Sequence, residues 1–213
     1  LFSVSDQVVL VSGASRGIGK RLAQGFAERG AQVVITGRQQ DTLEKTADEL
    51  STDEATVDFV VCDVAQPEDI ESTVSTVLKR HGRVDTLVNV AGVNKRKRSE
   101  SYTPEEYDFI LDINLKGAFH VAQAVGRHMI ERGSGAQINI DSLNTYAPLK
   151  GVVPYAMSKG GLTMMTRGLA NEWGDYGVRV NGLAPGMILT DLNRALWAKP
   201  HMREWGLDNT PLG

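Results

Sequence analysis

The sequence predicts an α/β fold with one doubly wound parallel sheet and a layer of helices on each face, in a single domain that spans residues 1–213. Short runs rich in valine, isoleucine and leucine alternate with longer amphipathic stretches, and no linker, repeat or low-complexity segment interrupts them. The predicted strands are 7–12, 32–37, 57–63, 85–92, 136–142 and 178–186, and the predicted helices are 17–30, 40–50, 67–82, 104–132 and 155–176.

The predicted strands are nearly continuous apolar runs. This pattern is typical of parallel strands that helices cover on both faces. Six strands that alternate with helices favour right-handed crossovers between parallel neighbours, which gives a three-layer αβα architecture. Pro67 and Pro104 suit the first turns of helices, where a missing N–H is harmless, and Thr103 is a candidate cap.

Composition and charge exclude several classes of protein. A net charge of −3 and a pI of about 5.8 argue against a general nucleic-acid binder, which is usually basic. No apolar run approaches the roughly 18 residues that a membrane span requires, so no membrane partner is expected. Cys62 is the only cysteine, which excludes an intrachain disulfide and fits a cytoplasmic location. The four histidines are scattered, so we expect no metal site.

The stretch "SGASRGIG" (12–19) follows the first predicted strand and opens the first predicted helix. Its glycines allow a tight turn and a close approach of backbone to a pyrophosphate, and the helix N-terminus favours negative charge. A glycine-rich connection without a ligand is the alternative. The position after the first strand favours a Rossmann-type dinucleotide site, in which we include Gly13, Ser15, Arg16, Gly17, Ile18 and Gly19.

The end of the second predicted strand indicates which dinucleotide is bound. NAD-binding folds usually carry an acidic residue there, but this chain reads "TGR" at 36–38 and has no carboxylate before Asp41. An arginine has the planar donor fork that phosphate recognition favours, so Arg38, joined by Arg16, could face a 2′-phosphate. Alternatively Arg38 is merely solvated. We therefore favour NADP(H) as the cofactor, with NAD(H) possible.

Further motifs follow in a fixed order: "NVAG" after the fourth strand, "DINLKGAFH" in the next helix, a serine thirteen residues before "Y-x-x-x-K", and "PG" followed by a threonine. With the glycine turn they resemble the short-chain dehydrogenase/reductase family over residues 7–190, although Val90 replaces the family's second asparagine. The resemblance implies an oxidoreductase that moves a hydride between a nicotinamide cofactor and a substrate. Its catalytic residues would be Asn114, Ser142, Tyr155 and Lys159.

The chemistry explains why these residue types are needed. Hydride transfer to a ketone creates an alkoxide that must be stabilised and protonated. A free phenol has a pKa near ~10, but a lysine one helical turn away lies on the same face and lowers it. Tyr155 is therefore the expected acid–base and Lys159 its activator. By resemblance, Ser142 fixes the carbonyl oxygen, Lys159 also bonds the nicotinamide ribose, and Asn114 holds a water that links Lys159 to solvent.

The resemblance also implies the cofactor contacts. Asp63 and Val64 resemble the pair that contacts adenine, and the loop after Pro185 resembles the one that holds the nicotinamide carboxamide. Beyond the glycine turn and Arg38, the predicted contacts are Asp63, Val64, Asn89, Ala91, Gly92, Tyr155, Lys159, Pro185, Gly186, Ile188 and Thr190.

Segments outside the catalytic motifs indicate the class of substrate. "VAGVNKR", "VAQAVGRHMIERG" and "LAPGMILTDLNRAL" most resemble gluconate 5-dehydrogenases and related sugar-acid dehydrogenases of the family. Arg96 would then receive the carboxylate in bidentate fashion, with Ser142 and Asn144 as further substrate contacts. Alternatively the basic run 95–98 is a solvated charge run, or it meets an acidic carrier protein, as in 3-oxoacyl-(acyl-carrier-protein) reductase, which shares the same motifs.

The last segment, 187–213, is expected to form a substrate lid, in which Trp197, Met202 and Trp205 cover the substrate or pack in a core or interface. Family members commonly continue beyond this point, so the resemblance implies a further C-terminal strand that the sequence does not contain. The sequence also departs from the family at Asp141, where a small or apolar residue is usual. Neighbours on a strand alternate faces, so Asp141 could point away from the substrate.

Two expectations concern the molecule as a whole. By resemblance, the helices at 104–132 and 155–176 pair subunits, which implies a homotetramer or a homodimer. A cofactor-binding protein without catalysis, or an inactive scaffold, is the alternative from a different functional class, since a fold does not determine a function. The intact set of Ser142, Tyr155 and Lys159 favours an enzyme that acts on a small molecule.

Overall fold

The computed structural model of the chain describes residues 3–52, 55–190 and 193–210. These residues form a six-stranded sheet in the order β3-β2-β1-β4-β5-β6, and all neighbouring strands run parallel. The predicted doubly wound α/β fold is confirmed. The strands are β1 (Val8–Ser12), β2 (Gln32–Gly37), β3 (Val57–Val61), β4 (Thr86–Asn89), β5 (Gly135–Ile140) and β6 (Val178–Leu183).

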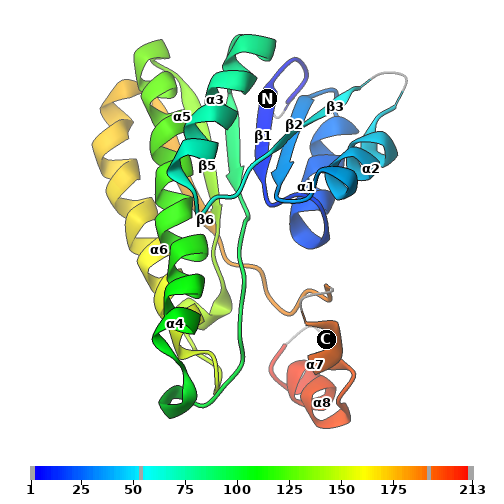
Figure 1. Ribbon diagram of the computed structural model, residues 1–213, viewed down its shortest axis with the longest axis vertical. Helices are drawn as coiled ribbons and strands as arrows, with labels where there is room; N and C mark the ends of the chain where they lie inside the picture. Colours follow the sequence, from blue (N-terminus) through cyan, green and yellow to red (C-terminus); the bar gives the residue numbers. More distant parts are fainter. Residues whose placement is uncertain (1–2, 53–54, 191–192, 211–213) are drawn as a thin grey trace.

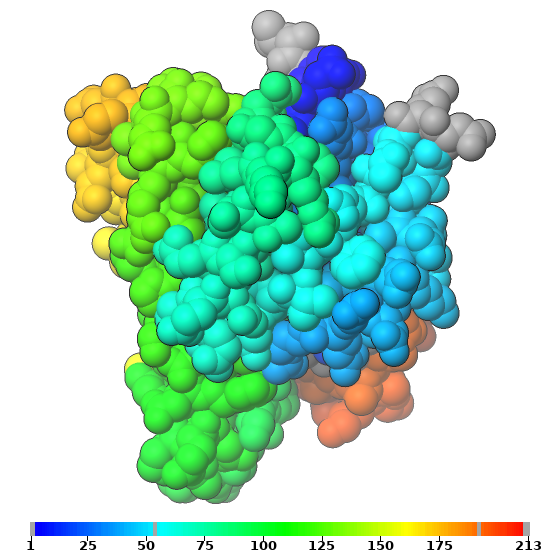
Figure 2. Space-filling model, turned by 45° about the horizontal axis from the view of Figure 1, so that its top comes forward, coloured from blue at the N-terminus to red at the C-terminus, as the bar shows by residue number. Residues whose placement is uncertain are grey.

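Helices flank both faces of the sheet (Figure 1). They are α1 (Gly17–Ala27), α2 (Gln40–Leu50), α3 (Pro67–His81), α4 (Pro104–Leu111), α5 (Ala118–Arg132), α6 (Val153–Trp173), α7 (Arg194–Trp197) and α8 (Pro200–Asp208). Successive side chains of a strand point to opposite faces. Val9 and Val11 of β1 therefore pack with α1 and α2, whereas Val8 and Leu10 pack with α3, α5 and α6. Figure 2 shows the side chains of α3 and α5 as a continuous surface over the second face.

The predicted helix 104–132 is continuous, but its middle is not α-helical. A π-helical segment, η2 (Asp112–Gly117), joins α4 to α5. Thr103 caps α4, as the sequence predicts, and forms a reciprocal capping box with Glu106. A π-helical turn holds one more residue than an α-turn and is frequent at functional sites. Here it places Asn114 completely inside the protein, with 0% of its surface exposed.

The carboxyl ends of the strands lie along one edge of the sheet. The chain order reverses between β1 and β4, which pair in register from Val9 with Thr86 to Ser12 with Asn89. Open α/β sheets bind ligands in the crevice that such a switch point leaves. Because the predicted site segments nearly all follow strands, the topology gathers them at this edge.

The chain after β6 leaves the sheet and ends in α7 and α8, which lie beyond the carboxyl edge (Figure 1, orange to red). The indole of Trp197 lies where a side chain on Gly206 would stand, at 2.5 Å from the position of its Cβ, so α7 and α8 pack closely. Of the predicted lid segment 187–213, residues 191–192 and 211–213 lie outside the described residues. In the part of the chain that the structure describes, no helix has both the length and the apolarity to span a bilayer.

Candidate active site

A cavity of about 1000 Å³ opens at the carboxyl edge of the sheet. Its walls are the turn between β1 and α1, the segments after β2, β3, β4 and β5, the start of α6, and the lid helices α7 and α8. All of the predicted catalytic, cofactor and substrate residues line it except Asn89 and Asn114. The structure therefore brings together segments that are up to about 180 residues apart in the sequence, as a doubly wound sheet does at its switch point.

The glycine turn has the geometry that a pyrophosphate site requires. Gly13 and Gly17 have φ values of 69° and 58°, in the left-handed region that favours glycine. A Cβ on Gly13 would lie 2.6 Å from the Cα of Ala91, and one on Gly19 would lie 2.4 Å from the carbonyl oxygen of Gly13. Side chains at these positions would collide with neighbouring backbone, so glycine lets the turn pack closely against the loop after β4 and against the first turn of α1. The N-terminus of α1 then faces the cavity, where it favours a negatively charged phosphate.

Two arginines stand on the dinucleotide end of the cavity. Arg16 and Arg38 are both exposed and line the wall, Arg16 in the glycine turn and Arg38 directly after β2. Among the described residues neither guanidinium has a hydrogen bond or an ion pair, which leaves the full donor fork of each available to a ligand. A carboxylate that would receive a ribose 2′-hydroxyl is absent from this part of the described wall.

Asp63 and Val64 line the cavity after β3, and the carboxylate of Asp63 accepts a hydrogen bond from the backbone of Ala65 at 3.0 Å. The backbone near Val64 is closely packed, because a Cβ on Gly117 would lie 2.4 Å from the Val64 carbonyl oxygen. Within the described ranges no three His, Cys, Asp or Glu side chains gather as a metal ion would require.

Asn89 lies behind the wall. Its Oδ1 accepts a hydrogen bond from Ser12 Oγ at 2.9 Å, and its Nδ2 donates to the carbonyl oxygen of Ala118 at 2.8 Å. The side-chain amide is therefore used within the protein, while Ala91 and Gly92 after it do reach the cavity. Sequence reasoning grouped these residues because they are adjacent, but strand alternation turns Asn89 inward.

On the nicotinamide side the loop after β6 lines the cavity with Pro185, Gly186, Ile188 and Thr190. The backbone N–H of Thr190 donates to Asn193 Oδ1 at 2.8 Å, and Asn193 Nδ2 donates to the carbonyl oxygen of Ile188 at 2.8 Å. This asparagine bridge holds the loop in a compact turn before α7. A Cβ on Gly17 would lie 3.8 Å from the Thr190 side chain, so the loop closes over the glycine turn.

Ser142, Tyr155 and Lys159 meet at the centre of the wall. Ser142 follows β5, and Tyr155 and Lys159 lie one turn apart in α6, with the Lys159 Nζ 5.9 Å from the Tyr155 ring centre. Lys159 is only 4% exposed, and its Nζ donates to the carbonyl oxygen of Ile140 at 2.7 Å. Burial lowers the pKa of this ammonium to about 8, while the charge of Asp141 raises it.

The pKa of Tyr155 is raised, whereas the sequence predicts that Lys159 lowers it. Burial is the largest cause, a hydrogen bond with the Ser142 hydroxyl opposes it, and the negative charge of Asp141 adds to it. Lys159 gives its hydrogen bond to the Ile140 carbonyl instead of to the phenol. Activation of the phenol therefore requires positive charge beyond what the protein alone brings to it.

Asn114 lies behind the catalytic wall and joins two of its segments. Its Oδ1 accepts from the backbone N–H of Val93 at 2.8 Å, and its Nδ2 donates to the Val93 carbonyl at 2.9 Å and to Ser158 Oγ at 3.1 Å. Ser158 Oγ in turn donates to the carbonyl oxygen of Tyr155 at 2.7 Å. The π-helical turn thus fixes the loop after β4 against the first turns of α6.

The basic run 95–98 divides into surface charges and one cavity residue. Lys95 and Lys97 both pair with Glu106 of α4, the second at 2.5 Å, and Arg98 pairs with Glu100 at 2.6 Å. Arg96 alone of the four lines the cavity, where its Nη1 donates to the Lys150 carbonyl at 2.8 Å.

Asn144, the other predicted substrate residue, organises the turn after Ser142. Its backbone N–H and its Nδ2 each donate to Ser142 Oγ at 3.2 Å, and its Oδ1 accepts from the Leu149 N–H at 2.9 Å. The two bonds occupy the acceptor positions of Ser142 Oγ, so its proton is directed outward as a donor.

Sequence reasoning missed Ser12, Ser158 and Tyr146. Ser12 Oγ accepts from the N–H groups of Val90 and Ala91 at 3.2 and 3.4 Å, and Tyr146 lines the cavity with 67% of its surface exposed. The pairing of the first and fourth strands in a Rossmann sheet could have indicated Ser12. Ser158 carries no signal, because a serine beside a catalytic lysine is as easily a plain helix residue.

The chain matches known proteins over nearly its full length. The model of the short chain dehydrogenases matches residues 7–201. Gluconate 5-dehydrogenase of Gluconobacter oxydans is 36% identical over 213 residues, which are 100% of this chain and 83% of that protein. NAD-dependent glycerol dehydrogenase of Listeria innocua is 36% identical over 197 residues, 92% of this chain and 76% of that protein.

A solved structure, gluconate 5-dehydrogenase from Burkholderia cenocepacia in complex with NADP and tartrate, superposes with a TM-score of 0.92. It is 38% identical and covers 96% of this chain and 80% of its own. These similarities confirm the resemblance that the motifs indicate.

Proposed function

The chain belongs to the short chain dehydrogenase family and is an oxidoreductase, and we propose that it interconverts a secondary alcohol and a ketone of a sugar acid such as gluconate and 5-ketogluconate, with NADP(H). In this proposal residues 1–213 form one dinucleotide-binding catalytic domain, and 187–213 cover the substrate. The observation that carries the proposal is the meeting of Ser142, Tyr155 and Lys159 on one wall of a cavity whose other end is the glycine turn.

Ser142 and Tyr155 act on the oxygen atom of the substrate in this proposal. When bound, a nicotinamide cofactor supplies or accepts the hydride, and its oxidised ring adds positive charge. During reduction of a ketone the Ser142 hydroxyl, already directed outward by Asn144, donates to the carbonyl oxygen. The Tyr155 phenol gives its proton to that oxygen as the hydride reaches the carbon, and in the oxidation direction the phenolate takes the proton back.

Lys159 stabilises the phenolate by its charge and bonds the nicotinamide ribose. With a pKa of about 8 its ammonium is protonated at neutral pH yet able to release a proton. Asn114 holds the loop after β4 against Tyr155 and positions a water that connects Lys159 to solvent. The proposed cofactor contacts are those lining residues that the motifs indicate, with Asn89 acting from behind the wall through Ser12.

The preference for NADP(H) rests on Arg16 and Arg38. Both line the cavity, Arg16 in the glycine turn and Arg38 after β2, and neither guanidinium has a partner among the described residues. A 2′-phosphate offers each of them charge-assisted, bidentate hydrogen bonds. The Burkholderia structure was solved with NADP, but the Listeria relative is named as NAD-dependent. Similarity to these proteins therefore does not select one cofactor, and the preference for NADP(H) depends on the two arginines.

The sugar-acid substrate rests on Arg96. Its guanidinium lines the cavity and keeps donors free beyond the one bonded to Lys150, whereas the other three basic residues of the run pair with glutamates. A carboxylate is the ligand that matches a guanidinium. Two of the matched proteins are gluconate 5-dehydrogenases, and one of them holds tartrate, a hydroxylated dicarboxylate.

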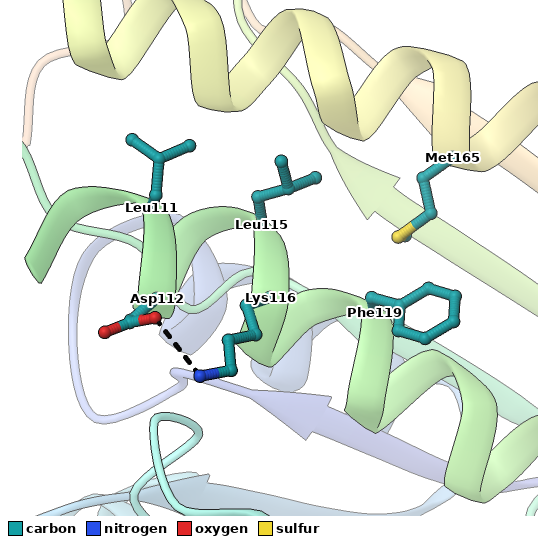
Figure 3. A pocket seen from close by; sticks show the side chains of 6 residues that line it. All are labelled: Leu111, Asp112, Leu115, Lys116, Phe119 and Met165. Carbon is teal, nitrogen blue, oxygen red and sulfur yellow. Dashed lines mark hydrogen bonds and ion pairs between the residues drawn. The ribbon is translucent and has the colours of Figure 1, made fainter. Parts of the chain in front are cut away.

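We also propose that the chain forms a homodimer or homotetramer through α4, η2, α5 and α6. A hollow on this face is lined by Leu111, Asp112, Leu115, Lys116, Phe119 and Met165, as Figure 3 shows. Phe119 is 37% exposed and Met164 of α6 is 61% exposed. Large exposed apolar side chains that gather on one face favour an interface between proteins.

Replacement of Tyr155 by phenylalanine tests the reaction. Tyr155→Phe removes the proton donor and should lower kcat by about 100- to 10,000-fold. Binding of NADPH, followed by its fluorescence, should remain. Tyr176→Phe is the matched control, because it removes an exposed phenol that does not line the cavity and should leave kcat within a few-fold. Normal turnover by Tyr155→Phe would refute the proposed mechanism and leave a cofactor-binding protein.

Replacement of Arg38 tests the cofactor preference. Arg38→Ala should lower kcat/KM for NADPH by about 10- to 100-fold, since hydrogen bonds to charged groups contribute about 1.5–3 kcal/mol. The value for NADH should stay unchanged, because NADH has no 2′-phosphate. Arg21→Ala, a change on the outer surface of α1, serves as the control. An equal effect on both cofactors would contradict the proposal.

A substrate panel tests Arg96. Kinetics would be measured with 5-ketogluconate, a neutral polyol and a 3-oxoacyl thioester. Arg96→Leu should lower kcat/KM for 5-ketogluconate by about 10- to 100-fold and leave the neutral polyol unaffected. Arg98→Leu, from the same basic run but paired with Glu100, should change neither. Turnover of the thioester alone by the unaltered protein would assign a different substrate.

Sedimentation velocity tests the proposed interface. Phe119→Glu places a charge on the apolar face and should convert the oligomer into monomers, because burial of an unpaired charge is costly. Tyr176→Glu changes an exposed aromatic residue at the other end of α6 and should leave the oligomer intact. A monomeric unaltered protein at micromolar concentration would contradict the proposal.

A further inference from the structure

Asp141 is a buried carboxylate in the catalytic wall that the mechanism above does not use. It follows Ile140, whose carbonyl oxygen binds Lys159, and precedes Ser142. Only 6% of its surface is exposed, and it lines the same cavity as both neighbours. A carboxylate is rarely buried to this degree unless its charge is paired or well hydrogen-bonded.

The hydrogen bonds of Asp141 connect three parts of the site. Oδ1 accepts from the N–H of Ser142 at 2.9 Å and from Thr145 Oγ1 at 2.6 Å, in the turn that carries Ser142. Oδ2 accepts from Thr163 Oγ1 of α6. The backbone N–H of Asp141 donates to the carbonyl oxygen of Leu183 in β6 at 2.7 Å. The Asp141 side chain thus accepts in every hydrogen bond that it makes, and three parts of the site supply the donors or lie next to them.

The charge of Asp141 has no ion-pair partner among the described residues, and the buried Lys159 ammonium is a cation on which this charge acts. Thr163 lies one turn after Lys159, so the carboxylate contacts the same face of α6 that carries the lysine. Buried opposite charges stabilise each other strongly because little water screens them.

Other charged groups near α6 do not offset this interaction. On α4, Glu106 pairs with Lys95 and Lys97, and on η2, Asp112 pairs with Lys116. Among the charged groups in the described part of the chain, Asp141 alone shifts the pKa of Lys159. The remaining ionisable groups on the cavity wall are Arg16, Arg38, Cys62, Asp63, Arg96, Tyr146 and Lys199.

We propose that Asp141 is a positioning residue that keeps Lys159 protonated in the buried site and holds the Ser142 turn against α6. The inference rests on the proposed function, because it concerns the acid–base pair of that reaction. Its negative charge compensates the burial of the ammonium, and its hydrogen bonds set the distance between the turn and the helix.

The direction of the pH effect follows from the charge. Asp141 raises the pKa of both Lys159 and Tyr155, so its removal makes loss of a proton from the pair easier whichever residue releases it. Alcohol oxidation requires the pair to have lost one proton from the phenol. The acid limb of kcat/KM for oxidation should therefore move to lower pH when the charge is removed.

The test compares variants that separate charge from hydrogen bonding. Asp141→Asn keeps the shape and removes the charge, Asp141→Glu keeps the charge, and Thr163→Val removes one hydrogen bond and keeps the charge. Asp141→Asn should move the acid limb down by about one pH unit, as a buried neighbouring charge typically does. In Asp141→Glu and Thr163→Val, the acid limb of kcat/KM should lie at the same pH as in the unaltered protein, even if the Tm of these variants falls.

A second readout is independent of turnover. The phenolate absorbance of Tyr155, obtained by subtracting the titration of Tyr155→Phe in each background, should rise at lower pH in Asp141→Asn. An unmoved profile and titration in Asp141→Asn, or an equal displacement in Thr163→Val, would overturn the proposal. Absence of any oxidoreductase activity in the unaltered protein would refute the proposed function, while the phenol titration would still test Asp141.

The neutral variant could fail to fold because of the buried position. Asp141→Ser is then the second neutral variant, since its small hydroxyl leaves room for water to join Thr145 and Thr163. Failure of both neutral variants to fold, with Asp141→Glu folded, would assign the carboxylate a structural role only and overturn the proposal.

Discussion

The site depends on the close approach of two turns at the switch point of the sheet. Ser12 Oγ donates to Asn89 Oδ1 across β1 and β4, and accepts from the first two N–H groups beyond Asn89. The glycine turn leaves β1 at this point, and Gly13 passes so near Ala91 that a Cβ has no room. A buried polar group without a partner costs about 1–3 kcal/mol, so this local network holds both phosphate-side turns in one arrangement. The cavity, the glycine cradle and the catalytic wall are all placed relative to it.

Backbone and side-chain groups together compensate the burial of the Lys159 ammonium. Burial disfavours the Lys159 ammonium, yet the reaction needs it charged. The carbonyl of Ile140, the last residue of β5, and the carboxylate of Asp141, the residue after it, both act on this ammonium. The same burial and the same carboxylate raise the pKa of Tyr155. Both influences favour the protonated phenol, which fits the proposed role of Tyr155 as the proton donor in ketone reduction.

The sequence predicted the fold and most of the cavity, because both depend on local patterns. Apolar runs mark strands covered on both faces, and the glycines of 13–19 mark a turn that only glycine can form. Features that depend on distant contacts were not predictable. The π-helical turn holds Asn114 where its side chain bonds Val93 and Ser158, which lie far away in the sequence. Strand alternation left open that Asp141 points away from the substrate, but β5 ends at Ile140 and the turn after it brings the carboxylate to α6.

Arg96, the residue proposed to bind a sugar acid, is tied to the segment before α6 by hydrogen bonds. Arg96 lies in a loop, but its guanidinium bonds the Lys150 carbonyl, and the next residue bonds Gly151 through its N–H at 3.0 Å. The Tyr102 hydroxyl donates to carbonyls in both segments. The loop after β4 and the loop before α6 therefore form one unit that ends at Tyr155. A guanidinium restrained by such a bond loses less conformational freedom when it binds a carboxylate. Under the proposed function, the hydrogen bonds that join these two loops would therefore favour an anionic substrate as well as position the start of α6.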